Sequence, residues 1–354
     1  MALKISFLIL LFLSLKAFSE EELPILFAKQ PASYVRFISK DGTYTYYLTR
    51  SGSLMLSTNY QSMEVIKGIP GTNYLINSSP TRKMLLITMD QNYLDFMSQR
   101  EANTIYKMSF GKKDAEKIGY GLDPKLHLED SWASYFNIQE NAINFQNLTS
   151  EALRFKIILN NPINPYFIPQ AVMFDKETVL FTDLSTTGVP AISTFRRSDK
   201  KSKLIFKGTS PFEKIEICLK NDLLVVGHFG FDKSNKGSSV DLIPIKDLQE
   251  SNKKNIYKSA KNDIGNLVCD FEKDNIYFIK NYSTNINQVY EVASLNIDTK
   301  EEKKLTSLLN ATQILSMDDK LLLSVFGKTY VLAGRSDYQK DLFNKEPDKK
   351  KGKK

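Results

Sequence analysis

The sequence predicts an all-β fold, a β-propeller of seven four-stranded antiparallel sheets. A two-strand unit recurs along almost the whole chain: an apolar or aromatic strand, a short polar turn, and a second strand rich in Tyr, Phe, Leu, Ile and Val. Seven such turns follow one another at a mean spacing of about 46 residues, which suits one propeller blade per repeat. Several of the strands are apolar on both faces, as expected when each sheet is packed between two neighbours.

The turns place the repeats in order. The clearest copy runs from Phe37 to Thr49 (FISKDGTYTYYLT) and turns at Asp41-Gly42, a dipeptide that favours tight hairpins. The other turns are expected at Thr81-Arg82-Lys83, Gln139-Glu140, Asp175-Lys176, Asn221-Asp222, Lys273-Asp274 and Asp318-Asp319. The blades then cover roughly residues 32–69, 71–121, 124–163, 166–210, 212–261, 264–308 and 311–334.

The last repeat has only three strands, and the segment Pro24 to Ala28 (PILFA) precedes the first repeat without a partner. This segment can supply the missing outer strand of the last blade, which would close the ring and cover a sheet edge. We therefore expect one propeller domain over residues 20–335.

Residues 1–19 are expected to form a signal peptide. Lys4 precedes the apolar stretch 5–15, and Ala17-Phe18-Ser19 puts small residues where a signal peptidase cuts. An uncleaved anchor is the alternative, but a membrane-spanning helix needs roughly 20 apolar residues.

The net charge of +8 comes mainly from the ends of the chain. The signal segment carries two Lys, and the last ten residues (KEPDKKKGKK) carry six Lys against two acids, so the body is only about +2. A nucleic-acid partner is therefore not expected, because it requires a basic face on the folded domain. Residues 336–354 are expected to be a disordered Lys-rich tail, with at most weak contact to anionic surfaces.

The first repeat resembles a known family. Phe37-Ile38-Ser39-Lys40-Asp41-Gly42, followed by Tyr44-Thr45-Tyr46-Tyr47-Leu48, is similar to the strand pair of TolB-like propellers. The later copies keep only the shape, and there is no room for the α/β domain that precedes the propeller of TolB itself. The resemblance implies a bacterial, exported propeller that binds other proteins, in the periplasm of a Gram-negative bacterium or secreted.

The two cysteines lie one repeat apart, each in the first strand of its blade. A disulfide between Cys218 and Cys269 is conceivable in an exported chain. Cys218 lies four residues before Asp222, however, and Cys269 lies five before Asp274, which would point the side chains to opposite faces. We therefore expect two buried free thiols.

Motifs for catalysis, metals and cofactors are not apparent in the sequence. The two histidines, His127 and His228, lie about a hundred positions apart, and neither a zinc-ligand pattern nor a phosphate-binding loop occurs. We therefore expect neither cofactor nor metal, and a protein that is not an enzyme. Acids that meet at the channel mouth would instead indicate a glycan-binding or glycan-cleaving propeller.

Two long loops are the candidate sites for binding a protein partner from the envelope or outside the cell. Gln91 to Asn103 carries Tyr93, Phe96 and Arg100, and Asn161 to Gln170 carries Tyr166 and Phe167 in a proline-rich stretch. Aromatic residues and Arg are enriched at the centres of protein interfaces. The alternative is that these aromatics cap the blades.

Overall fold

The computed structural model describes residues 25–26, 34–38, 44–49, 51–58, 61–68, 73–78, 84–90, 103–150, 152–160, 167–230, 237–260, 263–270, 274–283, 288–308, 311–317, 320–325 and 328–333. The predicted signal peptide (1–19), the predicted tail (336–354) and the candidate residues Tyr93, Phe96, Arg100 and Tyr166 lie outside these ranges.

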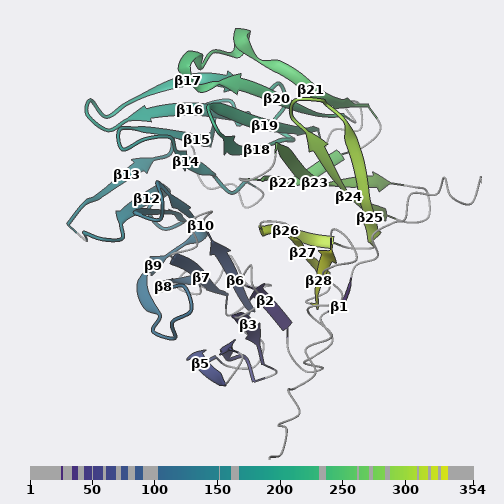
Figure 1. The fold of residues 1–354 in the computed structure, drawn as a ribbon. Coiled ribbons are helices and arrows are strands. Elements are labelled where there is room, and N and C mark those ends of the chain that lie inside the picture. Colours follow the sequence, from purple (N-terminus) through teal and green to yellow (C-terminus); the bar gives the residue numbers. More distant parts are fainter. Residues whose placement is uncertain are drawn as a thin grey trace, which may run out of the picture.

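Within these ranges the chain forms seven four-stranded antiparallel sheets around a common centre (Figure 1). The first three sheets contain β2 (Tyr34–Ile38), β3 (Thr45–Leu48), β4 (Leu54–Ser57) and β5 (Ser62–Ile66); β6 (Asn73–Ser78), β7 (Met84–Asp90), β8 (Asn103–Ser109) and β9 (Glu116–Tyr120); and β10 (Leu122–His127), β11 (Trp132–Asn137), β12 (Ala142–Asn147) and β13 (Arg154–Ile158).

The next three sheets contain β14 (Ala171–Met173), β15 (Thr178–Leu184), β16 (Pro190–Arg196) and β17 (Lys201–Lys207); β18 (Glu213–Lys220), β19 (Leu223–Gly230), β20 (Ser238–Pro244) and β21 (Lys254–Ser259); and β22 (Asp263–Cys269), β23 (Asn275–Ser283), β24 (Gln288–Asn296) and β25 (Glu302–Leu308). The seventh contains β26 (Ala311–Met317), β27 (Lys320–Val325), β28 (Lys328–Ala333) and β1 (Ile25–Leu26). Two short 3-10 helices, η1 (Ile245–Asp247) and η2 (Glu250–Asn252), separate β20 from β21. Among the described residues, no helix is long and apolar enough to span a membrane.

The sheets are the blades of a propeller. The first strands, from β2 through β6, β10, β14, β18 and β22 to β26, contact one another in turn around the centre, and the fourth strands lie outside (Figure 1). The prediction of an all-β propeller is confirmed, and the blade limits agree with the sequence repeats to within a few residues.

One turn was assigned wrongly. Gln139-Glu140 joins β11 to β12, not the first two strands of the third blade. The first hairpin turns over residues 128–131, where Leu128, Glu129 and Asp130 all have positive φ. Residues other than Gly rarely adopt this conformation, so the sequence carries no usual turn signal there.

The ring is closed by the N-terminal strand, as predicted. β1 pairs with β28 in antiparallel register, with Ile25 opposite Val331 and Leu26 opposite Tyr330. It occupies the fourth, outer position of the last sheet. The two ends of the described chain therefore share one blade, and the outer edge of β28 is covered.

Deleting residues 20–30 should therefore lower the free energy of unfolding, on the order of 2 kcal/mol, because β28 loses ladder hydrogen bonds and its edge is exposed. Urea unfolding followed by circular dichroism measures the change. Truncation after Asn344 is the matched control and should leave the transition unchanged. A deletion variant as stable as the full chain would contradict the closure.

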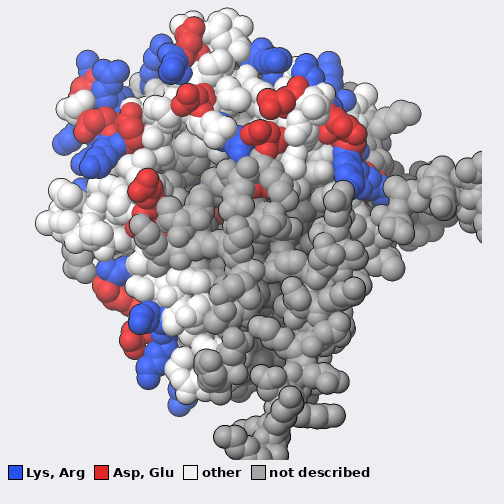
Figure 2. Space-filling view, viewed as in Figure 1, with Lys and Arg blue, Asp and Glu red and all other residues white. Residues whose placement is uncertain are grey.

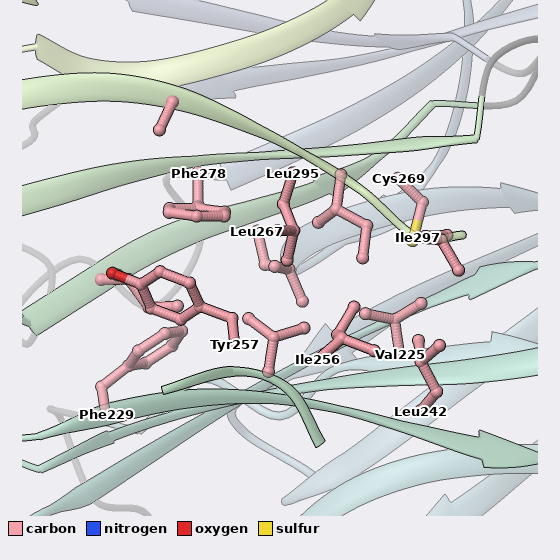
Figure 3. Close-up of a cluster of buried hydrophobic side chains, with 14 residues drawn as sticks. Val225, Phe229, Leu242, Ile256, Tyr257, Leu267, Cys269, Phe278, Leu295 and Ile297 are labelled. Atoms are coloured by element: carbon pink, nitrogen blue, oxygen red, sulfur yellow. The ribbon is translucent and has the colours of Figure 1, made fainter. Parts of the chain in front are cut away.

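A separate hydrophobic cluster fills each interface between successive sheets from the first blade to the sixth. Figure 3 shows the cluster between the fifth and sixth blades, where Phe229 and Tyr257 lie opposite Leu267 and Phe278. Full burial of such a side chain stabilises the fold by about 1.5–3 kcal/mol. The second to fifth sheets are therefore apolar on both faces, which explains the strands that do not alternate between polar and apolar residues.

The prediction of free thiols is wrong: Cys218 and Cys269 form a disulfide, with their Cα atoms 6.0 Å apart. Cys218 pairs with Val225 and Cys269 with Ile276, so each cysteine lies seven residues before its partner in the second strand. These four residues all belong to the cluster between the fifth and sixth blades, so Cys218 points toward the sixth blade and Cys269 toward the fifth, from opposite faces of their sheets. The sequence argument that the side chains leave opposite faces was right, but its conclusion was wrong, because cysteines of neighbouring blades can meet only from opposite faces.

Side chains also join the first strands of neighbouring blades. The backbone N–H groups of Met173, Ile217 and Leu267 each donate to a side chain of the preceding blade. The acceptors are His127 Nδ1 at 3.4 Å, Gln170 Oε1 at 2.9 Å and Glu216 Oε2 at 2.6 Å, respectively. A first strand is a sheet edge, so these bonds satisfy backbone groups that face the next blade.

Candidate protein-binding face

The strand ends that flank the two candidate loops lie on one face of the propeller. Strand direction alternates within each blade, so the start of every first strand and the end of every second strand lie on the same side. Residues 91–102 follow β7, a second strand, and residues 159–170 precede β14, a first strand. The topology thus brings the end of β7 and the start of β14 to the same side, which we call the loop face.

The proline-rich loop is fixed at both of its ends by β15. At its start, Asp183 Oδ2 accepts hydrogen bonds from the backbone N–H of Asn160 (3.1 Å) and from Asn160 Nδ2 (3.3 Å). At its end, Gln170 N donates to Thr182 Oγ1 and Thr182 N donates to Gln170 O, both at 2.8 Å. Two adjacent residues of one buried strand therefore hold the base of the loop.

Asp183 is a buried carboxyl whose hydrogen-bond donors all come from the protein. Burial raises the pKa of Asp183, and hydrogen bonds from Asn160 and from the backbone N–H of Leu184 partly offset this rise. Since polar groups and not a cation satisfy the carboxyl, its visible role is to anchor the loop.

The described end of this loop exposes apolar side chains. Ile168 is 45% exposed, Phe167 is half-buried and Pro169 is buried. Phe167 thus lies three residues before the anchored Gln170. An anchored segment such as residues 167–170 loses little conformational entropy on binding, which favours affinity.

The loop between β17 and β18, residues 208–212, has the same character one blade further on. Phe212 is 65% exposed. Glu213 Oε2 accepts a 2.7 Å hydrogen bond from the backbone N–H of Thr209 and so closes the turn. β14 and β18 are neighbouring first strands, so Ile168 and Phe212 stand at the entries to adjacent blades on the loop face.

Glu213 also accepts a hydrogen bond from His228 Nδ1 at 2.8 Å. Burial opposes ionisation of Glu213, but the bonds from His228 and from the backbone of Thr209 and Ser210 hold its pKa below the usual value. The His228 ring packs against Phe206 with its centroid 4.4 Å away. The pair thus ties loop 208–212 to β19.

A carboxylate that orients an imidazole is also the arrangement of a general base. His228 Nε2, however, is buried and has no hydrogen-bond partner in the described part of the chain. None of the described side chains therefore offers a nucleophile that is hydrogen-bonded to Nε2. The contacts of the pair position loop 208–212 on β19.

His127 is a structural residue of the ring. It is buried in β10, where Nδ1 accepts from Met173 N, and Nε2 donates to Ser134 Oγ at 2.7 Å. Burial, with a smaller contribution from the charge of Lys125, lowers the pKa of His127 to about 3. The ring is therefore neutral at ordinary pH, with both nitrogens engaged.

The charges of the described surface are mixed. Figure 2 shows Lys and Arg side chains interspersed with Asp and Glu around the outer edge. Across the described ranges, no group of three or more His, Cys, Asp and Glu side chains could hold a metal ion.

Sequence reasoning missed Ile168, Phe212 and the anchors Asp183 and Glu213. A usable signal was present for two of them, because Ile168-Pro169 and Pro211-Phe212 both set a large apolar residue beside a proline just before a first strand. The sequence carries no such signal for the anchors Asp183 and Glu213. The partner of Asp183, for example, lies 23 residues earlier in the chain.

The comparisons with known proteins support the fold. No protein-family model matches the chain, and neither does any curated protein. Similar solved structures include a prolyl endopeptidase (TM-score 0.57, 11% identity, covering 87% of this chain and 51% of that one) and an oligogalacturonate lyase from Vibrio parahaemolyticus (0.56, 9%, 87% and 95%). Another is the β-propeller domain of Cps50 (Swd1) from Myceliophteria thermophila (0.52, 10%, 85% and 96%).

The chain spans about half the length of the prolyl endopeptidase. At these identities the likeness establishes the β-propeller fold and carries no activity over to this chain.

Proposed function

We propose that this propeller is a non-enzymatic protein-interaction module whose partner binds the loop face. The observation that carries the proposal is the pair of neighbouring loops before β14 and β18, which expose Ile168 and Phe212 and are held by the carboxylates of Asp183 and Glu213, respectively. Exposed apolar side chains on pre-organised loops are the features of a binding surface, because their contact area is gained at low entropic cost.

The partner we propose is a protein of the bacterial envelope or the extracellular space. The leader-like first residues, the resemblance to TolB-like propellers and the disulfide between Cys218 and Cys269 all favour export, because disulfides persist in oxidising compartments. The mixed surface charge favours a protein partner over nucleic acid. Glycan binding or cleavage, the alternative, would require acids that point into an open site, whereas Asp183 and Glu213 are engaged by protein donors.

Replacing both Tyr166 and Phe167 by Ala should weaken partner binding by about 2 kcal/mol, some thirtyfold, because the loop would lose its aromatic anchors. The measurement is crosslinking in intact cells with identification of the crosslinked protein by mass spectrometry, followed by titration of the purified pair. The melting temperature should stay unchanged, since the loop is held by Asp183 and Thr182.

Leu204→Ala is the matched control, because Leu204 is 55% exposed but lies within the outer strand β17. It should bind like the wild type. Binding that survived the loop substitution but was lost in His127→Gln or His228→Gln would contradict the proposal and direct the search to an enzyme.

A further inference from the structure

The outer strands of this propeller differ in how they protect their edges. Within the described ranges, a register shift or β-bulge interrupts the pairing of five outer strands with their neighbours: β5, β9, β17, β21 and β25. A sixth, β1, pairs over only two residues. Bulges and short strands prevent other chains from adding to an edge.

β13 is the outer strand without this protection. It pairs with β12 without a break, from Arg154 opposite Gln146 to Ile158 opposite Ala142. It lies on the periphery at the left of Figure 1, and the surface around β12 and β13 in Figure 2 is mostly white, whereas charged side chains crowd the edge near β16 and β17. A straight edge without a bulge suits the addition of a strand.

The backbone of β13 presents hydrogen-bonding groups outward in a regular row. Asn147 N donates to Leu153 O at 2.9 Å, and Leu159 N donates to Asn141 O at 3.0 Å. In an antiparallel pair every second residue bonds to the neighbour, so residues 153, 155, 157 and 159 face β12. Lys156 and Ile158 therefore direct their N–H and C=O groups away from the sheet.

The side chains of β13 hold the strand in place and leave apolar surface beside the edge. Phe155 stacks on Phe145 at 4.5 Å and on Phe195 of the next blade at 6.2 Å. On the exposed side, Ile158 is 68% exposed, and Leu153 just before the strand is 48% exposed. An added strand would find a rigid template and apolar contacts at both of its ends.

The charge of the edge selects its occupant. Arg154 and Lys156 are both exposed, and Lys156 pairs with Glu140 at 3.3 Å across a solvent-exposed gap, an interaction too weak to prevent exchange. A second copy of β13 could pair antiparallel with the first through the outward backbone groups of residues 154, 156 and 158. This register would place Lys156 opposite Lys156, which is unfavourable. The Lys-rich C-terminal segment is disfavoured for the same reason.

We propose that β13 accepts an extended segment of the partner protein, with alternating acidic and apolar residues, as a fifth strand of the third blade. The inference rests on the proposed function and locates part of that interface. β13 leads through Leu159 directly into Asn160, the first anchored residue of the proline-rich loop. A strand on β13 would thus be continuous with contacts on the loop face.

A peptide measurement tests the strand directly. The probe is a fluorescein-labelled ten-residue peptide of alternating Glu and Val, followed by fluorescence anisotropy with the full-length protein. Lys156→Pro removes an outward N–H without breaking the ladder to β12, a place where an edge strand tolerates proline. Lys156→Gln is the matched control for the lost charge. We expect binding to the wild type, about threefold weaker binding to Lys156→Gln, and at least tenfold weaker binding to Lys156→Pro.

Two further peptides distinguish strand addition from charge attraction. Both are tested on the wild-type protein, so the result does not require the Lys156→Pro variant to fold. The same peptide N-methylated at alternate residues keeps its charge but cannot pair, and we expect it not to bind the wild type. A peptide of alternating Lys and Val should not bind either. Equal binding of the methylated and unmethylated acidic peptides would overturn the proposal.

The outcomes also separate this inference from the proposed function. A crosslinked partner that depends on Tyr166 and Phe167 but not on Lys156→Pro, with no binding of the acidic peptide, overturns the β13 inference alone. If no crosslinked protein is lost on substitution of Tyr166 and Phe167 or on Lys156→Pro, both the proposed function and the β13 inference are overturned. A wild-type dimer in solution that Lys156→Pro dissociates would show that a second copy occupies the edge, and would likewise overturn the inference.

Discussion

Replacing Cys218 and Cys269 together by Ala should lower the free energy of unfolding by about 4 kcal/mol. The disulfide joins residues 51 positions apart, and closing a loop of that length restricts the unfolded chain by about this amount in the chain-entropy description. The link also joins β18 to β22, so its loss removes a covalent tie between two blades. Urea unfolding under non-reducing conditions measures the change.

Reductant supplies the control for this prediction. Wild-type protein in dithiothreitol should unfold at the same urea concentration as the double Ala variant, and the variant should be insensitive to dithiothreitol. A double variant within about 1 kcal/mol of the oxidised wild type would mean that the hydrophobic cluster between these blades holds them without the covalent link.

Acid should destabilise the protein through His127, beginning well above the pH at which carboxyl groups titrate. The pKa of His127 is lowered to about 3 in the fold, whereas an unfolded His has a pKa of about 6.5. Below pH 6.5 the unfolded chain therefore takes up a proton that the folded chain refuses. The free energy of unfolding should fall by about 1.4 kcal/mol per pH unit, some 4–5 kcal/mol by pH 3.

His127→Gln isolates this effect, because Gln170 makes the equivalent bond to the backbone of the next blade. Between pH 7 and pH 5, urea unfolding should show the wild type losing about 2 kcal/mol more stability than the variant, a mean difference in slope of about 1 kcal/mol per pH unit. The two proteins are compared by how steeply the free energy of unfolding depends on pH. The test therefore holds even if His127→Gln is less stable at every pH. Parallel slopes would mean that the buried ring accepts a proton readily.

Much of the fold could be predicted because local patterns define it. The apolar strands, the turn at Asn221-Asp222 and the spare segment containing Ile25 and Leu26 each signal their role over a few residues. The prediction failed where the backbone departs from those patterns. The turn at Leu128 to Asp130 uses positive φ without Gly. The disulfide was missed because opposite faces of two neighbouring sheets meet at one interface, so opposite parity allows the bond.

The candidate site could be predicted only in part, because contacts between blades decide it. The proline-rich loop was recognisable, but its anchoring needed Asn160 beside Asp183. The regularity of β13 is equally invisible in sequence, since bulges on the other outer strands arise from sheet twist and packing. Both features depend on which residues face each other across strands.

Site-specific photo-crosslinking in cells tests the central claim, that a protein binds the loop face, most directly. A benzophenone amino acid would replace Ile168, which is 45% exposed on the loop face, or Leu204, which is 55% exposed on the outer strand β17. The account predicts a discrete protein adduct from position 168 and none from position 204. Adducts of equal yield from both positions, or from position 204 alone, would contradict it.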